Sequence, residues 1–364
     1  MSTSIRAVLR AAKHTTAPQF PPRKFPTSGF VTLDATQKIE EEDLPSYVPE
    51  DYYSVYMGEV FGSRYKVVTK LGFGVNSTVW LCRDLRDHRY LTLKLRVRAR
   101  EHHPLDMHGD NEIKIIDVLN SFEIAGPHGN HKCILYEPLG MSYTDFLRLL
   151  PESRFPKELV QQSIQLLLVS LDYLHRCNVV HTDISPSNVL LGIEDHSILS
   201  QIEQDELEWP LARKVLNDRT IYFSRPMPVN KGLPVLCDLG EARVGTHMHR
   251  GDIMPGIYRA PEVILGMDWD SKVEIWAVGV MMWDLLEGNH LFFAEKNGML
   301  NDEQHVAEMV SFLGPPPPEY LKRSEKCYQY WDSQGNWKGS IPIPNQSFEI
   351  HEQWLNEEEQ ALFV

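Results

Sequence analysis

One short segment constrains the chemistry of this chain more than any other: residues 181–188, which read His-Thr-Asp-Ile-Ser-Pro-Ser-Asn. Asp183 precedes Asn188 by five positions, and the apolar run 189–191 follows directly. The segment therefore places a carboxylate and an amide one tight turn apart, ahead of a candidate strand. Because Asp and Asn around a proline also occur in ordinary surface turns, the segment alone leaves a functional and a purely structural interpretation open.

The spacing of the segment resembles the catalytic loop of protein kinases, H-x-D-x-x-x-x-N. In such a loop the aspartate accepts or orients the proton of an attacking hydroxyl, and the asparagine holds a Mg²⁺ ion that bridges the nucleotide phosphates. The resemblance implies that Asp183 is the base and Asn188 a metal ligand. The other elements expected of such an enzyme occur in the required order.

A glycine-containing turn joins two strand-like runs earlier in the chain, where residues 71–79 read Leu-Gly-Phe-Gly-Val-Asn-Ser-Thr-Val. Glycine lets the backbone approach phosphates closely. A P-loop would need a Gly-Lys-Ser/Thr ending before a helix, and none is present here. The run predicts a β-hairpin lid over nucleotide phosphates, although a plain turn is the alternative. The predicted nucleotide contacts are Leu71, Gly72, Gly74 and Val79.

A lysine and a glutamate further along form a candidate ion pair. Lys94 lies in the strand-like run 90–95, at the position of the kinase lysine that holds the α- and β-phosphates. A buried lysine needs a counter-ion, and the helical-looking run 111–119 supplies Glu112 on the edge of its apolar stripe. We therefore predict an activating Lys94–Glu112 ion pair, although either residue alone would more often be a solvated charge.

A short apolar strand ending in a proline suits a connection between two lobes; residues 133–140 read Cys-Ile-Leu-Tyr-Glu-Pro-Leu-Gly. Adenine recognition at such a connection uses backbone groups, so the proline removes nothing that is needed. The predicted contacts are the carbonyl of Glu137 and the N–H of Leu139, with Leu190 as a further nucleotide contact.

Two further motifs follow the catalytic loop. The run 235–240 ends in Asp-Leu-Gly, which makes Asp238 the second predicted Mg²⁺ ligand. Residues 258–262, Tyr-Arg-Ala-Pro-Glu, then close an activation segment. This last motif belongs to protein-substrate sites and so disfavours a kinase that acts on small molecules.

Together these elements resemble protein kinases, and the details resemble the SR protein kinase family (serine/arginine-rich-protein-specific kinases), in a divergent, fungal-type form with a short C-terminus. The resemblance covers about residues 40–340. The segments that carry the subfamily resemblance are 47–53, 58–61, 77–81, 181–183, 238–240 and 302–307.

The resemblance implies an α+β, two-lobed kinase fold within residues 41–364, with a small β-rich N-lobe (65–140) and a mostly helical C-lobe (141–364). It also implies ATP and Mg²⁺ as cofactors and phosphorylation of serine in basic, Arg/Ser-rich proteins. An insertion at 192–233 fits the spacer of this family. We predict a helix over its residues 197–209 and loop for the rest.

Departures from the family pattern motivate a second interpretation. Ser185 replaces the lysine that neutralises the transferred phosphoryl group, and Thr182 replaces the arginine that reads a phosphorylated activation loop. Glu274 stands where an aspartate would brace the catalytic loop, and the late arginine that would pair with Glu262 is absent, as are the last helices. An ATP-binding pseudokinase or scaffold with weak or no phosphoryl transfer is therefore the alternative to an active enzyme.

Composition bounds the remaining properties. With 364 residues and 42% apolar content, the chain can bury two cores, and no uninterrupted apolar stretch is long enough to span a membrane. The five cysteines lack metal-ligand spacing, which predicts reduced core residues. The net charge of −14 favours basic protein partners and disfavours nucleic acid, and we expect a monomer.

The N-terminal residues 1–40 begin with a basic, acid-free stretch that predicts a disordered tail. The resemblance implies a cytoplasmic and nuclear protein. Residues 1–25 also resemble a mitochondrial transit peptide, which leaves a mitochondrial location as the alternative.

Overall fold

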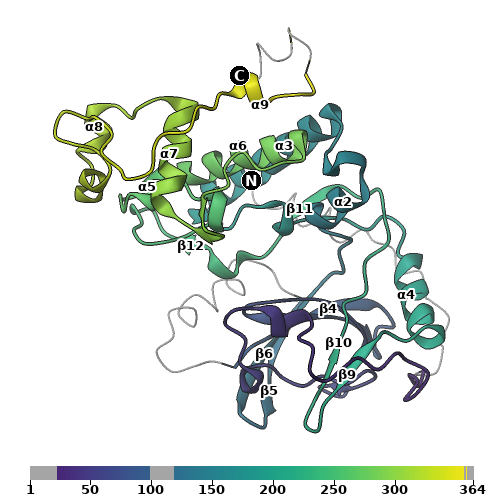
Figure 1. The fold of residues 1–364 in the computed structure, drawn as a ribbon. Helices are drawn as coiled ribbons and strands as arrows, with labels where there is room; N and C mark the ends of the chain where they lie inside the picture. Colours follow the sequence, from purple (N-terminus) through teal and green to yellow (C-terminus); the bar gives the residue numbers. More distant parts are fainter. Residues whose placement is uncertain (1–22, 99–118, 356–357, 359–364) are drawn as a thin grey trace. The chain divides into compact units, whose positions relative to one another are not determined.

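The computed structural model describes residues 23–98, 119–355 and 358. The chain divides into two compact units (Figure 1). Of the described residues, the first unit holds 23–98, 119–138 and 196–226, and the second holds 139–195 and the residues from 227 onward. The α+β composition predicted from the sequence is confirmed, because strands dominate the first unit and helices the second.

The first unit contains a six-stranded antiparallel sheet with the order β1-β2-β3-β4-β6-β5. The alternation of apolar and polar residues explains the strands, since Leu91, Leu93 and Leu95 of β4 are buried while the residues between them are only partly buried. These three leucines belong to one core cluster with Trp80 and Leu135. The strands are β1 (Val60–Phe61), β2 (Tyr65–Gly74), β3 (Ser77–Asp84), β4 (Tyr90–Arg96), β5 (Asn120–Gly126) and β6 (Gly129–Tyr136).

The insertion that follows the catalytic loop folds with the first unit (Figure 1). Its predicted helix is present as α4 (Ser197–Glu208). The prediction that the rest is loop is wrong, because β9 (Arg213–Val215) and β10 (Thr220–Tyr222) form an antiparallel hairpin. Tyr222 packs edge-on against Trp80 of the sheet core, with ring centroids 5.8 Å apart.

Buried ion pairs tie α4 to the sheet. Glu203 lies 2.8 Å from Nη1 of Arg83 on β3 and is almost fully buried. Glu206, equally buried, accepts a hydrogen bond from the hydroxyl of Thr69 on β2 at 3.1 Å and lies 2.6 Å from Nη2 of Arg225. A buried carboxylate is tolerated only with such partners, so removing one partner destabilises the unit far more than an exposed pair would.

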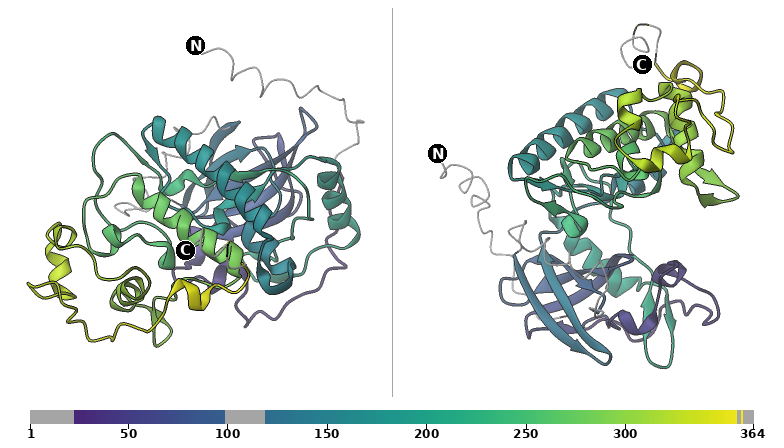
Figure 2. Two further views of the ribbon diagram at one scale, coloured as in Figure 1. Left: turned by 90° about the horizontal axis from the view of Figure 1, so that it is seen from above. Right: turned by 90° about the vertical axis from the view of Figure 1, so that its left-hand side faces the viewer.

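The second unit is mostly helical, as predicted. Its two longest helices, α3 and α6, pack side by side (Figures 1 and 2). Helix α6 is buried around most of its circumference, which matches its nearly continuous apolar sequence. The helices are α2 (Tyr143–Leu149), α3 (Lys157–Arg176), α5 (Pro261–Ile264), α6 (Lys272–Glu287), α7 (Asp302–Leu313), α8 (Pro318–Leu321) and α9 (Phe348–His351).

Short strands and 3₁₀ turns complete the second unit. The strand pairs are β8 (Val189–Leu191) with β11 (Pro234–Leu236), β7 (Val179–Val180) with β12 (Arg243–Val244), and β13 (Glu295–Lys296) with β14 (Met299–Leu300). Within the described residues, the 3₁₀ helices are η1 (Glu40–Asp43), η2 (Pro49–Asp51), η4 (Pro151–Ser153), η5 (Pro186–Asn188), η6 (Leu239–Glu241), η7 (Gly256–Tyr258) and η8 (Glu325–Gln329).

Two further expectations concern cysteines and membranes. None of the five cysteines forms a disulfide bond, but the expectation that they are core residues holds only in part, since Cys177 is exposed and Cys237 half-buried. Within the part of the chain that the structure describes, none of the helices has the length and apolarity of a membrane-spanning segment.

Candidate active site

A two-stranded ladder brings the two predicted metal ligands to one end of a small sheet. Strands β8 and β11 are antiparallel, with Val189 opposite Leu236. Asn188, just before β8, therefore lies beside the residues that follow β11, and the N–H of Cys237 donates to its carbonyl at 2.8 Å. Asp238 is the next residue, so the ladder places an amide and a carboxylate that are 50 positions apart in the sequence at the same edge.

The predicted base, Asp183, contacts Asn188 directly. The side-chain amide nitrogen of Asn188 donates to the backbone carbonyl of Asp183 at 2.7 Å and to its carboxylate at 2.6 Å. Pro186 opens the 3₁₀ turn η5 that ends at Asn188, because its fixed φ suits the first position of such a turn. These bonds leave the carbonyl oxygen of the Asn188 amide as the atom that can bind a metal.

Negative charge gathers around Asp183. Burial raises the pKa of the Asp183 carboxyl, and the nearby carboxylates of Asp238 and Glu241 raise it further, whereas the Asn188 amide and His181 lower it. Neighbouring carboxylates repel one another, and a bound cation would offset that repulsion. Nothing in the sequence singles out Glu241, which lies three residues after Asp238, at the end of η6.

The oxygen atoms at this edge fit Mg²⁺. This ion usually takes one or two protein carboxylates or amides and keeps several waters. One Asp238 oxygen accepts the N–H of Gly240 at 3.2 Å. Among the described residues, no group of three or more His, Cys, Asp or Glu side chains is placed to hold a metal, so a metal here depends on Asn188, Asp238 and non-protein ligands.

His181 orients the loop from inside the unit. Its ring is fully buried, with Nε2 2.8 Å from the carbonyl of Cys237 and Nδ1 3.2 Å from the N–H of Asp183. A neutral ring with its proton on Nε2 satisfies both contacts, because Nδ1 then accepts and Nε2 donates. His181 thereby links the catalytic loop to the strand that precedes Asp238.

Glu274 of α6 supports the backbone of the same loop. Its carboxylate is fully buried, and Oε1 accepts the N–H of Thr182 at 2.8 Å while Oε2 lies 2.6 Å from Nε2 of His175. Thr182 has a φ of 68°, a conformation that a β-branched residue adopts only when its surroundings hold it there. Although the Glu274 side chain is one methylene longer than that of aspartate, it still braces the loop through this hydrogen bond.

The structure also shows the surroundings of two other departures from the family pattern, Ser185 and the partner of Glu262. Ser185 is buried, and its backbone carbonyl accepts the N–H of Asn188 at 3.0 Å. Glu262, expected to lack an arginine partner, lies 3.8 Å from Nη1 of Arg323.

In the first unit, strand register aligns the predicted phosphate contacts. Gly72 of β2 is opposite Val79 of β3, and Val79 is opposite Lys94 of β4. Directly opposed side chains share a face, so Val79 and Lys94 lie on one face and the neighbouring pair Trp80 and Leu93 lies on the core face. Lys94 therefore lies in the same row as the glycine turn, as the family motif requires.

The glycines of this turn are not needed by the protein's own packing. A Cβ at Gly72 or Gly74 would meet no atom within 4 Å, and neither residue has a positive φ. Leu71 adjoins them at a register shift between Lys70 and Gly72. Open space over a glycine backbone is what close approach of a ligand would require.

The remaining predicted residues are placed as follows. Glu137, after the end of β6 in the first unit, pairs through its exposed carboxylate with Arg89 at 2.9 Å. Leu139 begins a stretch of the second unit, and Leu190 lies in β8. Glu112 falls outside the described residues, so its ion pair with Lys94 stays a prediction.

Comparison with known proteins adds four findings. A family model described as protein kinase domain matches residues 65–334. A serine/threonine protein kinase of Aspergillus fumigatus is 43% identical over 368 residues, which cover 94% of this chain and 88% of that protein. The serine/threonine-protein kinase SRPK of Physarum polycephalum is 32% identical over 82% of this chain and 78% of its own length. The crystal structure of a kinase domain aligns with a TM-score of 0.60 at 23% identity, covering 78% of this chain and 81% of that one.

Proposed function

Because this chain belongs to the protein kinase family, we propose that it is an ATP-dependent serine/threonine kinase that phosphorylates serine in Arg/Ser-rich proteins. The predicted two-lobed kinase fold is confirmed by the family match and by the solved kinase domain. Relatives at 43% and 32% identity are named serine/threonine protein kinases, which confirms the predicted enzyme class.

One observation carries the proposal for catalysis: the Asp183 carboxylate lies 2.6 Å from the Asn188 amide, at the edge where Asp238 also lies. In this arrangement Asp183 accepts or orients the proton of a substrate hydroxyl. Asn188 and Asp238 would hold Mg²⁺, which when bound supplies positive charge that offsets the phosphate oxygens. Lys94 and the backbone of Gly72 and Gly74 would contact the phosphates of ATP.

The substrate class is supported by charge and by similarity. The chain carries a net charge of −14, which favours a basic substrate. The Physarum relative is named SRPK. We further propose that the protein acts as a monomer in the cytoplasm and nucleus, with the mitochondrion as the alternative location. Of residues 1–25, which motivate that alternative, residues 1–22 lie outside the described part of the chain.

Ser185 favours a second candidate function, an ATP-binding pseudokinase or scaffold. Ser185 stands where the kinase pattern has a lysine, so less positive charge is available to stabilise the transferred phosphoryl group. Nucleotide binding could then persist with weak or no transfer.

A paired assay separates the two functions. Transfer of labelled phosphate from ATP to an Arg/Ser-repeat peptide is measured beside a thermal-shift titration with Mg-ATP, with a Lys/Ser-repeat peptide of equal charge as the specificity control. We expect transfer to the Arg/Ser peptide and at least fivefold less to the Lys/Ser peptide. A thermal shift without transfer supports the pseudokinase, and equal transfer to both peptides contradicts the substrate class.

A further inference from the structure

The tip of the glycine turn is held by a tyrosine from the segment that precedes the sheet. The hydroxyl of Tyr52 lies 3.1 Å from the carbonyl oxygen of Gly74 and 3.0 Å from that of Val75, so a single O–H group donates toward both. Gly74 and Val75 are the last residue of β2 and the first of the turn into β3. Tyr52 therefore contacts the backbone of the lid itself.

Tyr52 is held in place from both sides. Its ring packs against Tyr47 with a centroid distance of 5.1 Å. The preceding residue, Asp51, is buried and accepts a hydrogen bond from Nε of Arg98 at 2.8 Å, while the N–H of Arg98 donates to the Asp51 carbonyl at 2.9 Å. Burial raises the pKa of Tyr52, so its hydroxyl keeps its proton and stays a donor at any physiological pH.

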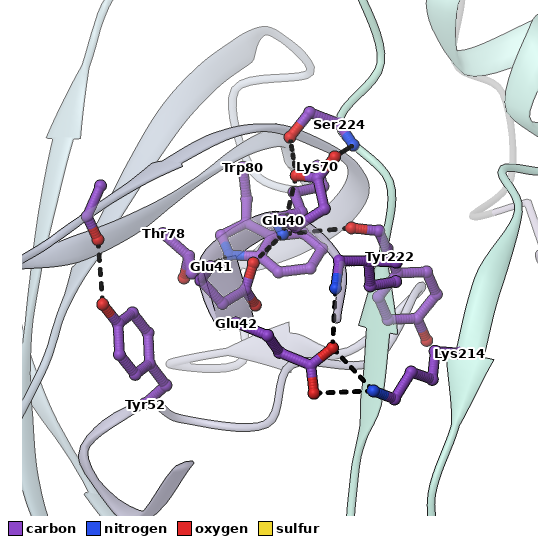
Figure 3. A network of polar contacts seen from close by, with 12 residues as sticks. Glu40, Glu41, Glu42, Tyr52, Lys70, Thr78, Trp80, Lys214, Tyr222 and Ser224 are labelled. Atoms are coloured by element: carbon purple, nitrogen blue, oxygen red, sulfur yellow. Dashed lines mark hydrogen bonds and ion pairs between the residues drawn. The ribbon is translucent and has the colours of Figure 1, made fainter. Parts of the chain in front are cut away.

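The other end of the lid is fixed by Lys70, the residue before Leu71. Its side chain is fully buried, and Nζ binds the carboxylate of Glu41, lies 3.2 Å from that of Glu40 and donates to the carbonyl of Tyr222 at 3.1 Å (Figure 3). The N–H of Arg225 donates to the Lys70 carbonyl at 2.9 Å. Strand β2 thus enters the glycine turn from a buried residue that several polar contacts hold in place.

Tyr52 and Lys70, which hold the two ends of the lid, are themselves supported by the same two segments, residues 40–52 and the insertion. Arg219, between β9 and β10, donates to the carbonyl of Pro49, which opens η2 just before Tyr52. Lys214 of β9 pairs with Glu42 at 2.7 Å. The insertion therefore supports the segment that carries Tyr52, and that segment supports the lid.

We propose that Tyr52 is a positioning residue that holds the glycine turn in its nucleotide-binding conformation before the nucleotide arrives, and so sets the affinity for ATP. The proposal rests on the proposed function, since it assigns the turn to ATP. A lid that is already ordered loses less conformational entropy on binding, and a competent state that is more populated binds with a lower apparent Kd. One hydrogen bond to a carbonyl contributes enough to shift that population by about threefold to tenfold.

The neighbouring tyrosine offers a matched control. Tyr53 also donates from its hydroxyl, but to the Glu59 carboxylate at 2.8 Å, and its ring packs on Phe61 and His131 away from the turn. Tyr52→Phe and Tyr53→Phe each remove one bonded hydroxyl from the same unit. Only the first removes a contact with the lid.

Two measurements on the full chain test the proposal. Amide hydrogen exchange across residues 74–77 of the nucleotide-free protein reports lid order, and KM for ATP is compared with kcat and with KM for the peptide. For Tyr52→Phe we expect faster exchange at 74–77 and a KM for ATP about threefold to tenfold higher, with kcat and peptide KM changed less than twofold. Tyr53→Phe should leave both lid exchange and the KM for ATP at wild-type values.

The outcomes separate this proposal from the proposed function. Unchanged lid exchange or unchanged ATP affinity in Tyr52→Phe overturns the positioning role, and so does an equal rise in KM for both variants. If the wild type binds Mg-ATP without transferring phosphate, the active-kinase assignment fails, while the Kd for ATP of the two variants still decides the role of Tyr52. A wild type that binds no ATP overturns both.

Discussion

Glu274 accepts the backbone N–H of Thr182 at 2.8 Å, from a helix that lies 92 positions further along the chain. Its second oxygen contacts His175 of α3, so one carboxylate joins α3, α6 and the catalytic loop. We expect Glu274→Ala to lower the free energy of unfolding by about 2–4 kcal/mol, because a buried N–H and a histidine lose their acceptor.

Glu274→Gln provides the control for that change, since its amide oxygen can still accept from Thr182. The loss should then be about half as large in denaturant titrations followed by fluorescence. Equal losses in both variants would show that the charge, and not the acceptor for Thr182, is what the loop requires.

Asp183→Asn should abolish phosphoryl transfer while ATP affinity changes by no more than about threefold, because the carboxylate acts on the substrate hydroxyl. An asparagine oxygen can still accept from the Asn188 amide, so the loop should stay folded. Transfer to the Arg/Ser peptide and calorimetric ATP binding are the measurements. Turnover retained in the variant would refute the assignment of the base.

Asp238→Ala should remove the Mg²⁺ dependence of nucleotide binding, since it deletes one of the two proposed oxygen ligands at the β8–β11 edge. Thermal shifts with ATP, in Mg²⁺ and in EDTA, should differ for the wild type and coincide for the variant. Cys237→Ala, a change at the adjacent half-buried residue, is the control and should keep the difference. Mg²⁺ dependence that survives in Asp238→Ala would place the metal elsewhere.

Ser185→Lys should raise kcat with little change in KM for ATP, if the missing ammonium limits the rate. A tenfold gain corresponds to about 1.4 kcal/mol, within what one charge supplies in a closed site. Because Ser185 is buried, Ser185→Met controls for the added length. No gain in a clearly active enzyme would mean that another basic group, on this chain or on the substrate, already fills the role.

Glu287, at the end of α6, makes the second unit sensitive to pH. Burial, followed by the charge of Glu352, raises the pKa of Glu287 from 4.5 to about 7. Between pH 4.5 and pH 7 the folded chain therefore holds a proton that the unfolded chain has released. The resulting stabilisation of the fold is complete below pH 4.5 and is lost as the pH rises through 7. Between pH 8 and pH 5.5 the wild type should gain roughly 2 kcal/mol of stability relative to Glu287→Gln.

Denaturant titrations at the two pH values measure this gain. Glu158→Gln, at an exposed position of α3, should follow the wild type at both. A pH dependence that is the same for the wild type and Glu287→Gln would show that the carboxyl titrates normally.

The predictions from sequence succeeded where short-range geometry decides the structure. Asp183 and Asn188 are close because they are only five positions apart and the short 3₁₀ turn that begins at Pro186 ends at Asn188. The alternation in β4 fixes which face Lys94 occupies. The hairpin β9–β10 could not be predicted in this way, because strands of three residues are too short to show a period.

Contacts between residues far apart in the sequence could not be predicted either. Neither the pairing of Lys70 with Glu41 nor the contact of Tyr52 with the glycine turn leaves a local signal, since each residue alone is an ordinary charge or aromatic ring. The bracing role of Glu274 likewise depends on how α6 packs, which side-chain length alone does not reveal.

Residues 196–226 of the insertion pack against the first sheet, and this affects how the chain can fold during synthesis on the ribosome. The carbonyl that binds Lys70 belongs to Tyr222, 152 residues later, and the carboxylate that binds Arg83 belongs to Glu203, 120 residues later. A nascent chain therefore cannot complete its first unit until residues 196–226 have been synthesised, and the whole catalytic loop precedes them in the sequence. A fragment that stops before residue 196 lacks these partners of two buried cations, so we expect it not to fold as an independent domain.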